Sequence, residues 1–151
     1  MRKMKFNPVF AIVTMLLVSL MVGCKKDKTT SFTGGTKEIR LLLPSAAGTI
    51  DVGAVVFREL ADGGVSSTIN LTSGFRFPGT NLNARVTTFD AIGTVLTYVD
   101  LGTVDGGSGV GVKSPVVNAG VNVPYAELIA KKGFIVRVNY SATIEATGVI
   151  N

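Results

Sequence analysis

The sequence contains no histidine and no tryptophan, and only one cysteine among its 151 residues. The absence of histidine excludes every mechanism that uses an imidazole as base or nucleophile, and every metal site that uses it as a ligand. With a single cysteine and no histidine there is also no Cys-His pair for nucleophilic catalysis. Three tyrosines and no tryptophan supply little material for a sugar-stacking platform. We therefore expect a protein that is not an enzyme and that binds no cofactor or metal ion.

The first 23 residues have the layout of an export signal. Three basic residues within Met1–Asn7 precede an apolar stretch, Val9–Gly23, which is shorter than the ~20 residues that a membrane-spanning helix needs. The stretch runs into Met21–Cys24 (MVGC), which resembles a bacterial lipobox with methionine in place of the commoner leucine. We predict a lipoprotein signal peptide over 1–23 and lipidation of Cys24. The alternative is a chance cysteine behind an ordinary signal peptide or a short anchor helix.

The next segment, 24–37, is polar and lysine-rich and has no apolar period. Such a composition predicts a flexible tether between the lipidated cysteine and a folded domain over 38–151. No aspartate directly follows Cys24, and the absence of that inner-membrane retention signal favours the outer membrane, on its periplasmic side or at the cell surface. The first predicted partner is therefore a membrane, contacted through the lipid anchor.

The net charge of +5 does not belong to the predicted domain. From Ile39 to Asn151 there are eight basic and eight acidic residues, so this part sums to zero. The signal peptide carries +3, and the segment 24–38 carries +2. Because nucleic-acid binding depends on neutralising phosphates with a basic surface, we expect no nucleic-acid partner.

Most of the domain consists of short runs rich in β-branched residues, separated by glycine-containing turns. This spacing predicts an all-β fold, an antiparallel Greek-key sandwich or flattened barrel of about 8 strands. One segment, near 124–132, has proline in its first turn and lysines before a glycine, which predicts a short helix capping one end. The predicted strands are Ile39–Leu43, Val52–Leu60, Val65–Leu71, Leu82–Phe89, Thr94–Leu101, Val110–Val117, Phe134–Tyr140 and Ala146–Ile150.

Several segments together resemble the CHRD (chordin-type) domain, which occurs in many bacterial exported proteins and lipoproteins. Gly53–Gly63 resembles its early strand and turn, and Asp100–Gly106 its mid-domain turn. Val123–Ile129 resembles its helix, and Gly133–Asn139 with Gly148–Ile150 its closing strands. The order and spacing of the segments carry the resemblance, which implies an envelope setting.

The family's histidines are missing from this chain. Its members usually carry an Ala-His-Ile-His strand and a further histidine in a late strand, and the matching positions here are Arg85, Thr87 and Asn139. The resemblance therefore transfers no metal-dependent property. Arg85 and Arg137 instead form a candidate basic spot on one sheet, which we treat as a speculative binding face. The alternative is two solvated arginines on the outer surface of their strands.

Two further patterns invite a functional interpretation. The glycine-rich run Gly106–Ser114 is similar to a phosphate-binding loop, but Val112 separates its last glycine from Lys113 and no helix follows. Asp100 and Asp105 flank a turn, and we interpret them as turn-forming residues because the alternating aspartates of a Ca²⁺ loop are missing.

The function that fits these features is that of a lipid-anchored outer-membrane or cell-surface lipoprotein. Its CHRD-like domain would serve as a non-enzymatic structural module or as a module that binds an envelope protein or glycan. The alternative is a carboxylate-dependent hydrolase of envelope glycans. That activity requires two acids, drawn for example from Glu59, Asp90 and Glu127, to face each other at ~5–9 Å.

Overall fold

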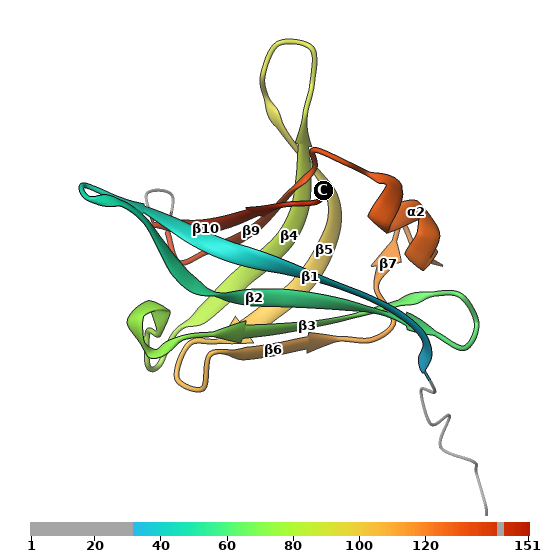
Figure 1. The fold of residues 1–151 in the computed structure, drawn as a ribbon, viewed down its shortest axis with the longest axis horizontal. Helices are drawn as coiled ribbons and strands as arrows, with labels where there is room; N and C mark the ends of the chain where they lie inside the picture. The colour runs from blue at the N-terminus through green and yellow to red at the C-terminus, as the bar shows by residue number, and fades with distance from the viewer. Residues whose placement is uncertain (1–31, 142–143) are drawn as a thin grey trace, which may run out of the picture. The chain divides into compact units, whose positions relative to one another are not determined.

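The computed structural model describes residues 32–141 and 144–151 and confirms the all-β prediction (Figure 1). Eight strands form a closed barrel in the order β1-β10-β9-β4-β5-β6-β3-β2, and every neighbouring pair is antiparallel. The predicted signal peptide and Cys24 lie outside the described residues. The barrel strands are β1 (Phe32–Ser45), β2 (Gly48–Leu60), β3 (Val65–Leu71), β4 (Asn81–Phe89), β5 (Val95–Asp105), β6 (Val110–Lys113), β9 (Ile135–Asn139) and β10 (Glu145–Val149).

The barrel closes through two short seams between strands. At one seam β1 and β10 share a single register pair, Leu42 with Thr147, and at the other β5 and β6 share only Asp105 with Val110. Glycines permit the close approach at both places. A Cβ atom on Gly148 would lie 2.3 Å from the carbonyl oxygen of Arg40, and one on Gly111 would lie 2.8 Å from that of Thr103. Of the two predicted arrangements, sandwich or barrel, the strand order gives the barrel.

Alternation of apolar residues along the strands fills the interior. In β4 the side chains of Leu82, Ala84 and Val86 are buried, while Asn83 and Arg85 lie on the outer face. The same period of two operates in β9. The largest fully buried side chains are Phe57, Phe75, Leu41, Ile69, Leu82, Leu101, Leu128 and Ile150. Phe75 comes from a 3₁₀ turn, η1 (Ser73–Phe75), between β3 and β4.

Several predicted boundaries are wrong: β2 begins at Gly48 and not at Val52, and β5 ends at Asp105 and not at Leu101. β1 begins at Phe32, so the last six residues of the predicted tether 24–37 belong to the barrel, where Lys37 pairs with Phe57 of β2. The predicted strand Val110–Val117 ends at Lys113, because Pro115 has no backbone N–H to continue the ladder. The chain then forms a small separate hairpin, β7 (Val117–Asn118) with β8 (Val121–Asn122).

The predicted helix is α2 (Tyr125–Ala130), which lies at one end of the barrel (Figure 1). Pro124 precedes its first turn, and Leu128 is fully buried in the core. Tyr125 and Ile129, which share its apolar face, pack against the same core. No helix in 32–141 or 144–151 has the length and apolar character to cross a membrane.

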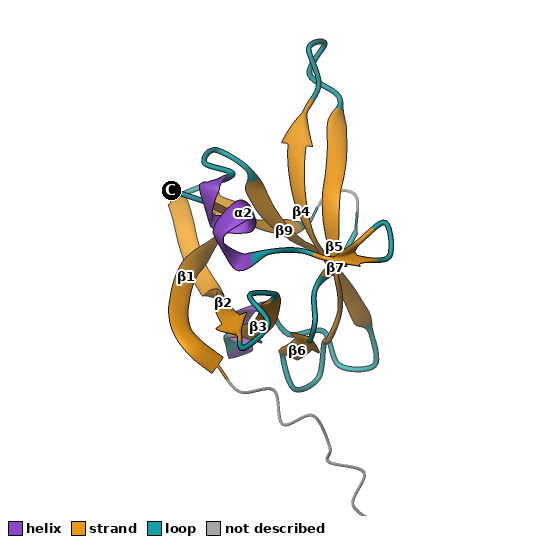
Figure 2. Ribbon diagram, turned by 90° about the vertical axis from the view of Figure 1, so that its right-hand side faces the viewer, coloured by secondary structure: helices purple, strands orange, loops and turns teal. Residues whose placement is uncertain are grey.

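The β4–β5 hairpin projects from the barrel as a two-stranded arm (Figures 1 and 2). Its turn is fixed by Asp90, whose Oδ1 accepts hydrogen bonds from the backbone N–H groups of Ile92 (3.0 Å) and Thr94 (2.7 Å). These backbone donors, Thr94 first, hold the pKa of the Asp90 carboxyl below its usual range. The arm exposes four large apolar side chains, Phe89, Ile92, Val95 and Leu96.

Candidate functional site

The two arginines singled out from the sequence lie side by side on the outer face of the barrel. Arg85 of β4 and Arg137 of β9 are direct cross-strand partners, and Asn83 and Asn139 form the next pair on the same face. In antiparallel strands such pairs have Cβ atoms ~4.5–5.5 Å apart, and like charges directly opposite each other are destabilising. Alternation along the two strands thus creates the predicted basic spot. We refer to the outer surface of β4, β9 and β10 as the arginine face.

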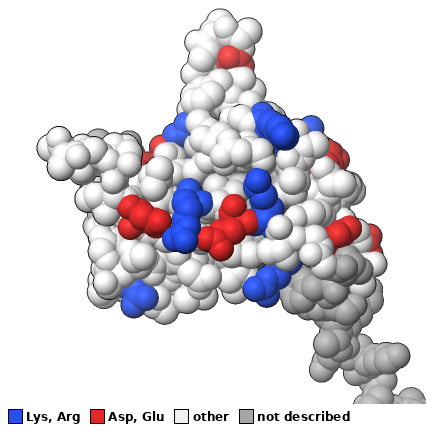
Figure 3. Space-filling view, in the orientation of Figure 1, with Lys and Arg blue, Asp and Glu red and all other residues white. Residues whose placement is uncertain are grey.

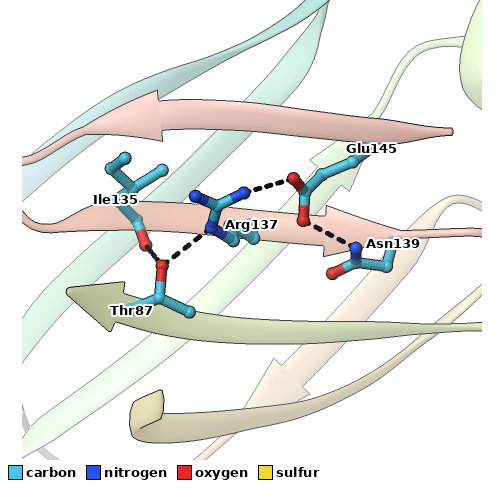
Figure 4. A network of polar contacts seen from close by, with 5 residues as sticks. All are labelled: Thr87, Ile135, Arg137, Asn139 and Glu145. Atoms are coloured by element: carbon cyan, nitrogen blue, oxygen red, sulfur yellow. Dashed lines mark hydrogen bonds and ion pairs between the residues drawn. The ribbon is translucent and has the colours of Figure 1, made fainter. Parts of the chain in front are cut away.

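Arg137 is held in a network of polar contacts that joins three strands (Figure 4). Its Nε donates a hydrogen bond to Thr87 Oγ1 (2.8 Å), and its guanidinium forms an ion pair with Glu145 of β10. Thr87 Oγ1 in turn donates to the carbonyl oxygen of Ile135 (3.2 Å), and Asn139 Nδ2 donates to Glu145 Oε1 (2.6 Å). The Arg137 side chain is only 13% exposed, so this arginine is a structural residue whose charge is neutralised by Glu145.

Arg85 differs from its neighbour because it has no counter-ion. No acidic oxygen of the described residues lies within 4 Å of its guanidinium, and its buried Nε has no hydrogen-bond partner among them. Asp100, its cross-strand partner on β5, accepts a hydrogen bond from the backbone N–H of Gly102 instead (2.7 Å). The alternative interpretation of two solvated arginines does not fit Arg137, whose side chain is 13% exposed within this network, whereas Arg85 is partly exposed.

A surface hollow of about 220 Å³ lies beside Arg85. It is lined by Asn83, Arg85, Asn139, Tyr140 and Ser141. Asn139 Oδ1 is buried and, like Arg85 Nε, has no partner in the described part of the chain. Among the described residues the lining holds one positive charge, no acidic side chain, two amides and two hydroxyl groups. An anion with hydroxyl groups suits this chemistry, because it can accept from the guanidinium and exchange hydrogen bonds with the amides.

Tyr140 gives the hollow an aromatic edge that the sequence did not reveal. Its ring stacks on Phe77, with centroids 4.0 Å apart and planes 8° apart, and Phe77 packs edge-to-face on the buried Phe75. Tyr140 itself is 41% exposed. No local signal joins these residues, since Tyr140 and Phe77 come from distant parts of the chain. For Asn83 a signal existed, because it shares the outward parity of Arg85 and Thr87.

None of the other residues considered from the sequence is part of the described lining of the hollow, although Asp100 is the cross-strand partner of Arg85. Asp105 is confirmed as a turn-forming residue, since its Oδ1 accepts from the N–H of Ser108 (2.6 Å). The turn interpretation is wrong for Asp100, which lies within β5 and accepts from the N–H of Gly102 there. The N–H of Ser108 is also the main reason why the pKa of Asp105 is lowered. Asp90 lies in the turn of the β4–β5 arm. Glu59 is the second-last residue of β2 and lies near Tyr125, where burial and then the charge of Glu59 raise the pKa of that phenol.

Glu127 of α2 belongs to a partly exposed cluster at the end of the barrel. Tyr98 donates a hydrogen bond to Glu127 Oε1 (2.7 Å), and Lys131 lies 3.5 Å from the same oxygen. The Tyr98 hydrogen bond, followed by Lys131, lowers the pKa of Glu127. Burial and then Glu127 raise the pKa of Tyr98 to about 12. These contacts tie the helix to β5.

A second hollow, of about 470 Å³, follows the seam between β1 and β10. Leu42, Pro44 and Val149 contribute apolar surface to it, and Glu38 is its one acidic side chain. Neither hollow therefore brings two acidic side chains together. Within 32–141 and 144–151 there is also no group of three or more Cys, Asp or Glu residues that could hold a metal ion.

Comparison of the chain with protein-family models, with curated proteins and with solved structures finds no match. The resemblance to the CHRD domain stays a prediction from the quoted segments. The geometry of the arginine face is thus the basis for any statement about function.

Proposed function

We propose that this chain is a lipid-anchored protein of the outer membrane, whose β-barrel is a binding module and not an enzyme. Its contact surface is the arginine face, and Arg85 in the hollow binds an anionic group of an envelope glycan. The lipid on Cys24 keeps the module at the membrane, as the resemblance to exported CHRD-domain lipoproteins also suggests.

The observation that carries the proposal is the unpaired charge of Arg85. A guanidinium that stands directly beside another guanidinium and has no counter-ion weakens the fold. A buried N–H without a partner adds a desolvation penalty of about 1–3 kcal/mol. Sites that sacrifice stability in this way are typical of residues kept for function. An anion bound in the hollow would supply the missing counter-charge.

The lipid anchor is tested by replacing Cys24 with alanine. We expect the C24A protein to lose metabolic labelling with a fatty acid and to leave the membrane fraction. Partition into the membrane that does not change in C24A would overturn the anchor.

The binding role is tested by measuring retention of the full-length protein on acidic and neutral envelope polysaccharides. We expect R85Q to lose retention on the acidic polymers, whereas R40Q, which removes an exposed arginine elsewhere on the barrel, retains it. Equal retention of R85Q and the wild type would overturn the role of Arg85. If capture of the protein on envelope material depends on Arg85 but survives enzymatic removal of the glycans, the partner is a protein. If the wild type releases shortened glycans, the protein is an enzyme.

A further inference from the structure

The residues that line the hollow beside Arg85 indicate which kind of anion it binds. We infer that it binds a sugar acid through a single carboxylate, with the sugar ring against Tyr140. This inference rests on the proposed function, since it specifies the ligand of the same site.

The charge of the site favours an anion with one negative charge. Arg137 is neutralised by Glu145, and Arg85 is the one charged side chain in the described lining of the hollow; it forms no ion pair within 4 Å among the described residues. A phosphate monoester carries ~−1.5 to −2 at pH 7 and would bring more negative charge than the site can balance. A carboxylate carries one negative charge, and its two oxygens fit the planar fork of a guanidinium.

The free hydrogen-bonding groups favour a ligand that has hydroxyl groups as well. Asn139 Nδ2 is engaged by Glu145, and Asn139 Oδ1 is buried without a partner among the described residues, so a ligand hydroxyl would reach it only after a small rotation of the amide. Asn83, its cross-strand partner, places a second amide at the hollow. Amides both donate and accept, which suits a row of hydroxyl groups on a ring.

Tyr140 supplies a fixed apolar surface at the edge of this polar site. Its ring cannot swing away without breaking the stack on Phe77, which is itself packed on buried Phe75. The C–H groups of a sugar ring pack well on such an aromatic plate, because its body is apolar while its hydroxyl group is polar. The hollow is also smaller than the ~300–1,000 Å³ of drug-sized ligand sites, so one sugar unit fits its size.

The experiment measures binding of three probes to the full-length protein in detergent, namely galacturonate, galactose and inorganic phosphate. We expect galacturonate to bind at least ~10-fold more tightly than galactose, since the charged hydrogen bonds are made only by the acid. R85Q should reduce the affinity for galacturonate to that for galactose. Y140L should weaken both sugars to a similar extent, and R40Q should change neither.

Urea unfolding of each variant shows whether the fold is intact, and R85Q is expected to be about as stable as the wild type because Arg85 forms no ion pair within the described residues. Phosphate that displaces galacturonate at equal concentration, or galactose that binds as tightly as the acid, would overturn the inference. In that case retention of the wild type but not of R85Q on acidic polysaccharides would still support the proposed function. Absence of Arg85-dependent binding in both experiments would overturn both proposals.

Discussion

Two outer faces of the barrel each use an arginine between two polar partners, but they bury it to very different degrees. On β1 and β2, Arg40 lies 3.1 Å from both Glu38 and Asp51, and its side chain is 66% exposed. Figure 3 shows acidic and basic groups alternating in a row over these strands. On the arginine face, Arg137 is 13% exposed and Glu145 22%. Exposed ion pairs contribute little because water screens them, whereas a buried pair must be complete or it destabilises the fold.

The largest effect is expected where the partly buried pair is broken. E145L removes the counter-ion of Arg137 and the acceptor of Asn139, so we expect the free energy of unfolding in urea to fall by about 1.5–3 kcal/mol. E145Q retains one acceptor and should lose less. If E145L loses less unfolding free energy than the removal of an exposed ion pair, Arg137 has found another partner. That result would contradict the difference between the two faces.

Removing both members of the pair sharpens the comparison. In R137M/E145L the buried charge disappears together with its counter-ion, and we expect the double variant to recover most of the stability lost in E145L. The double-mutant cycle then gives a coupling energy of about 2 kcal/mol. Additive losses in the two single variants would contradict a coupled pair.

The cluster at α2 is the intermediate case, and it responds to pH. Since the folded protein raises the pKa of Tyr98 from 10 to about 12, the phenol holds its proton more tightly than in the unfolded chain. The stabilisation is complete below pH 10 and is lost as the pH rises toward 12. The ultraviolet titration of tyrosinate, compared between the wild type and Y98F, isolates this group. E127Q should lower the pKa of Tyr98 only in part, because burial is the larger cause.

The smallest effect is expected on the β1–β2 face. R40Q removes both exposed ion pairs at once, and we expect unfolding to change by less than ~1 kcal/mol. The difference should shrink further in high salt, which screens surface charges. If R40Q lowers the free energy of unfolding as much as E145L does, and salt does not change this loss, the ion pairs of Arg40 are not the weak, exposed pairs that we describe.

Arg85 stands outside this comparison, because it lies on the arginine face but forms no ion pair with the part of the chain that the structure describes. Its neighbour Arg137 shares its residue type, its strand period and its place at the surface of the sheet. What separates them is Glu145, which lies across β9 from β4 and contacts only one of the two. The sequence predicted that the two arginines form one basic spot. In the structure Arg137 is held in an ion pair, whereas Arg85 lines the hollow.

The alternation of apolar residues and the glycine-rich turns were sufficient to predict an all-β fold, the positions of most strands and the short helix. These features depend on neighbours along the chain, where the period of two and the turn residues act directly. The same parity placed Arg85 and Thr87 on one face. The early start of β1 could not be predicted, because its polar residues 33–37 have no apolar alternation and are in a strand only through pairing with β2.

The sequence by itself determined the fold class, the neutral charge of the domain and the absence of any imidazole chemistry, since these follow from composition and local period. Only the tertiary structure decided that Glu145 neutralises Arg137 and leaves Arg85 unpaired, and that Tyr140 stacks on Phe77 beside it. Such contacts join residues far apart in the chain, and their energy depends on register and burial, which no local pattern contains.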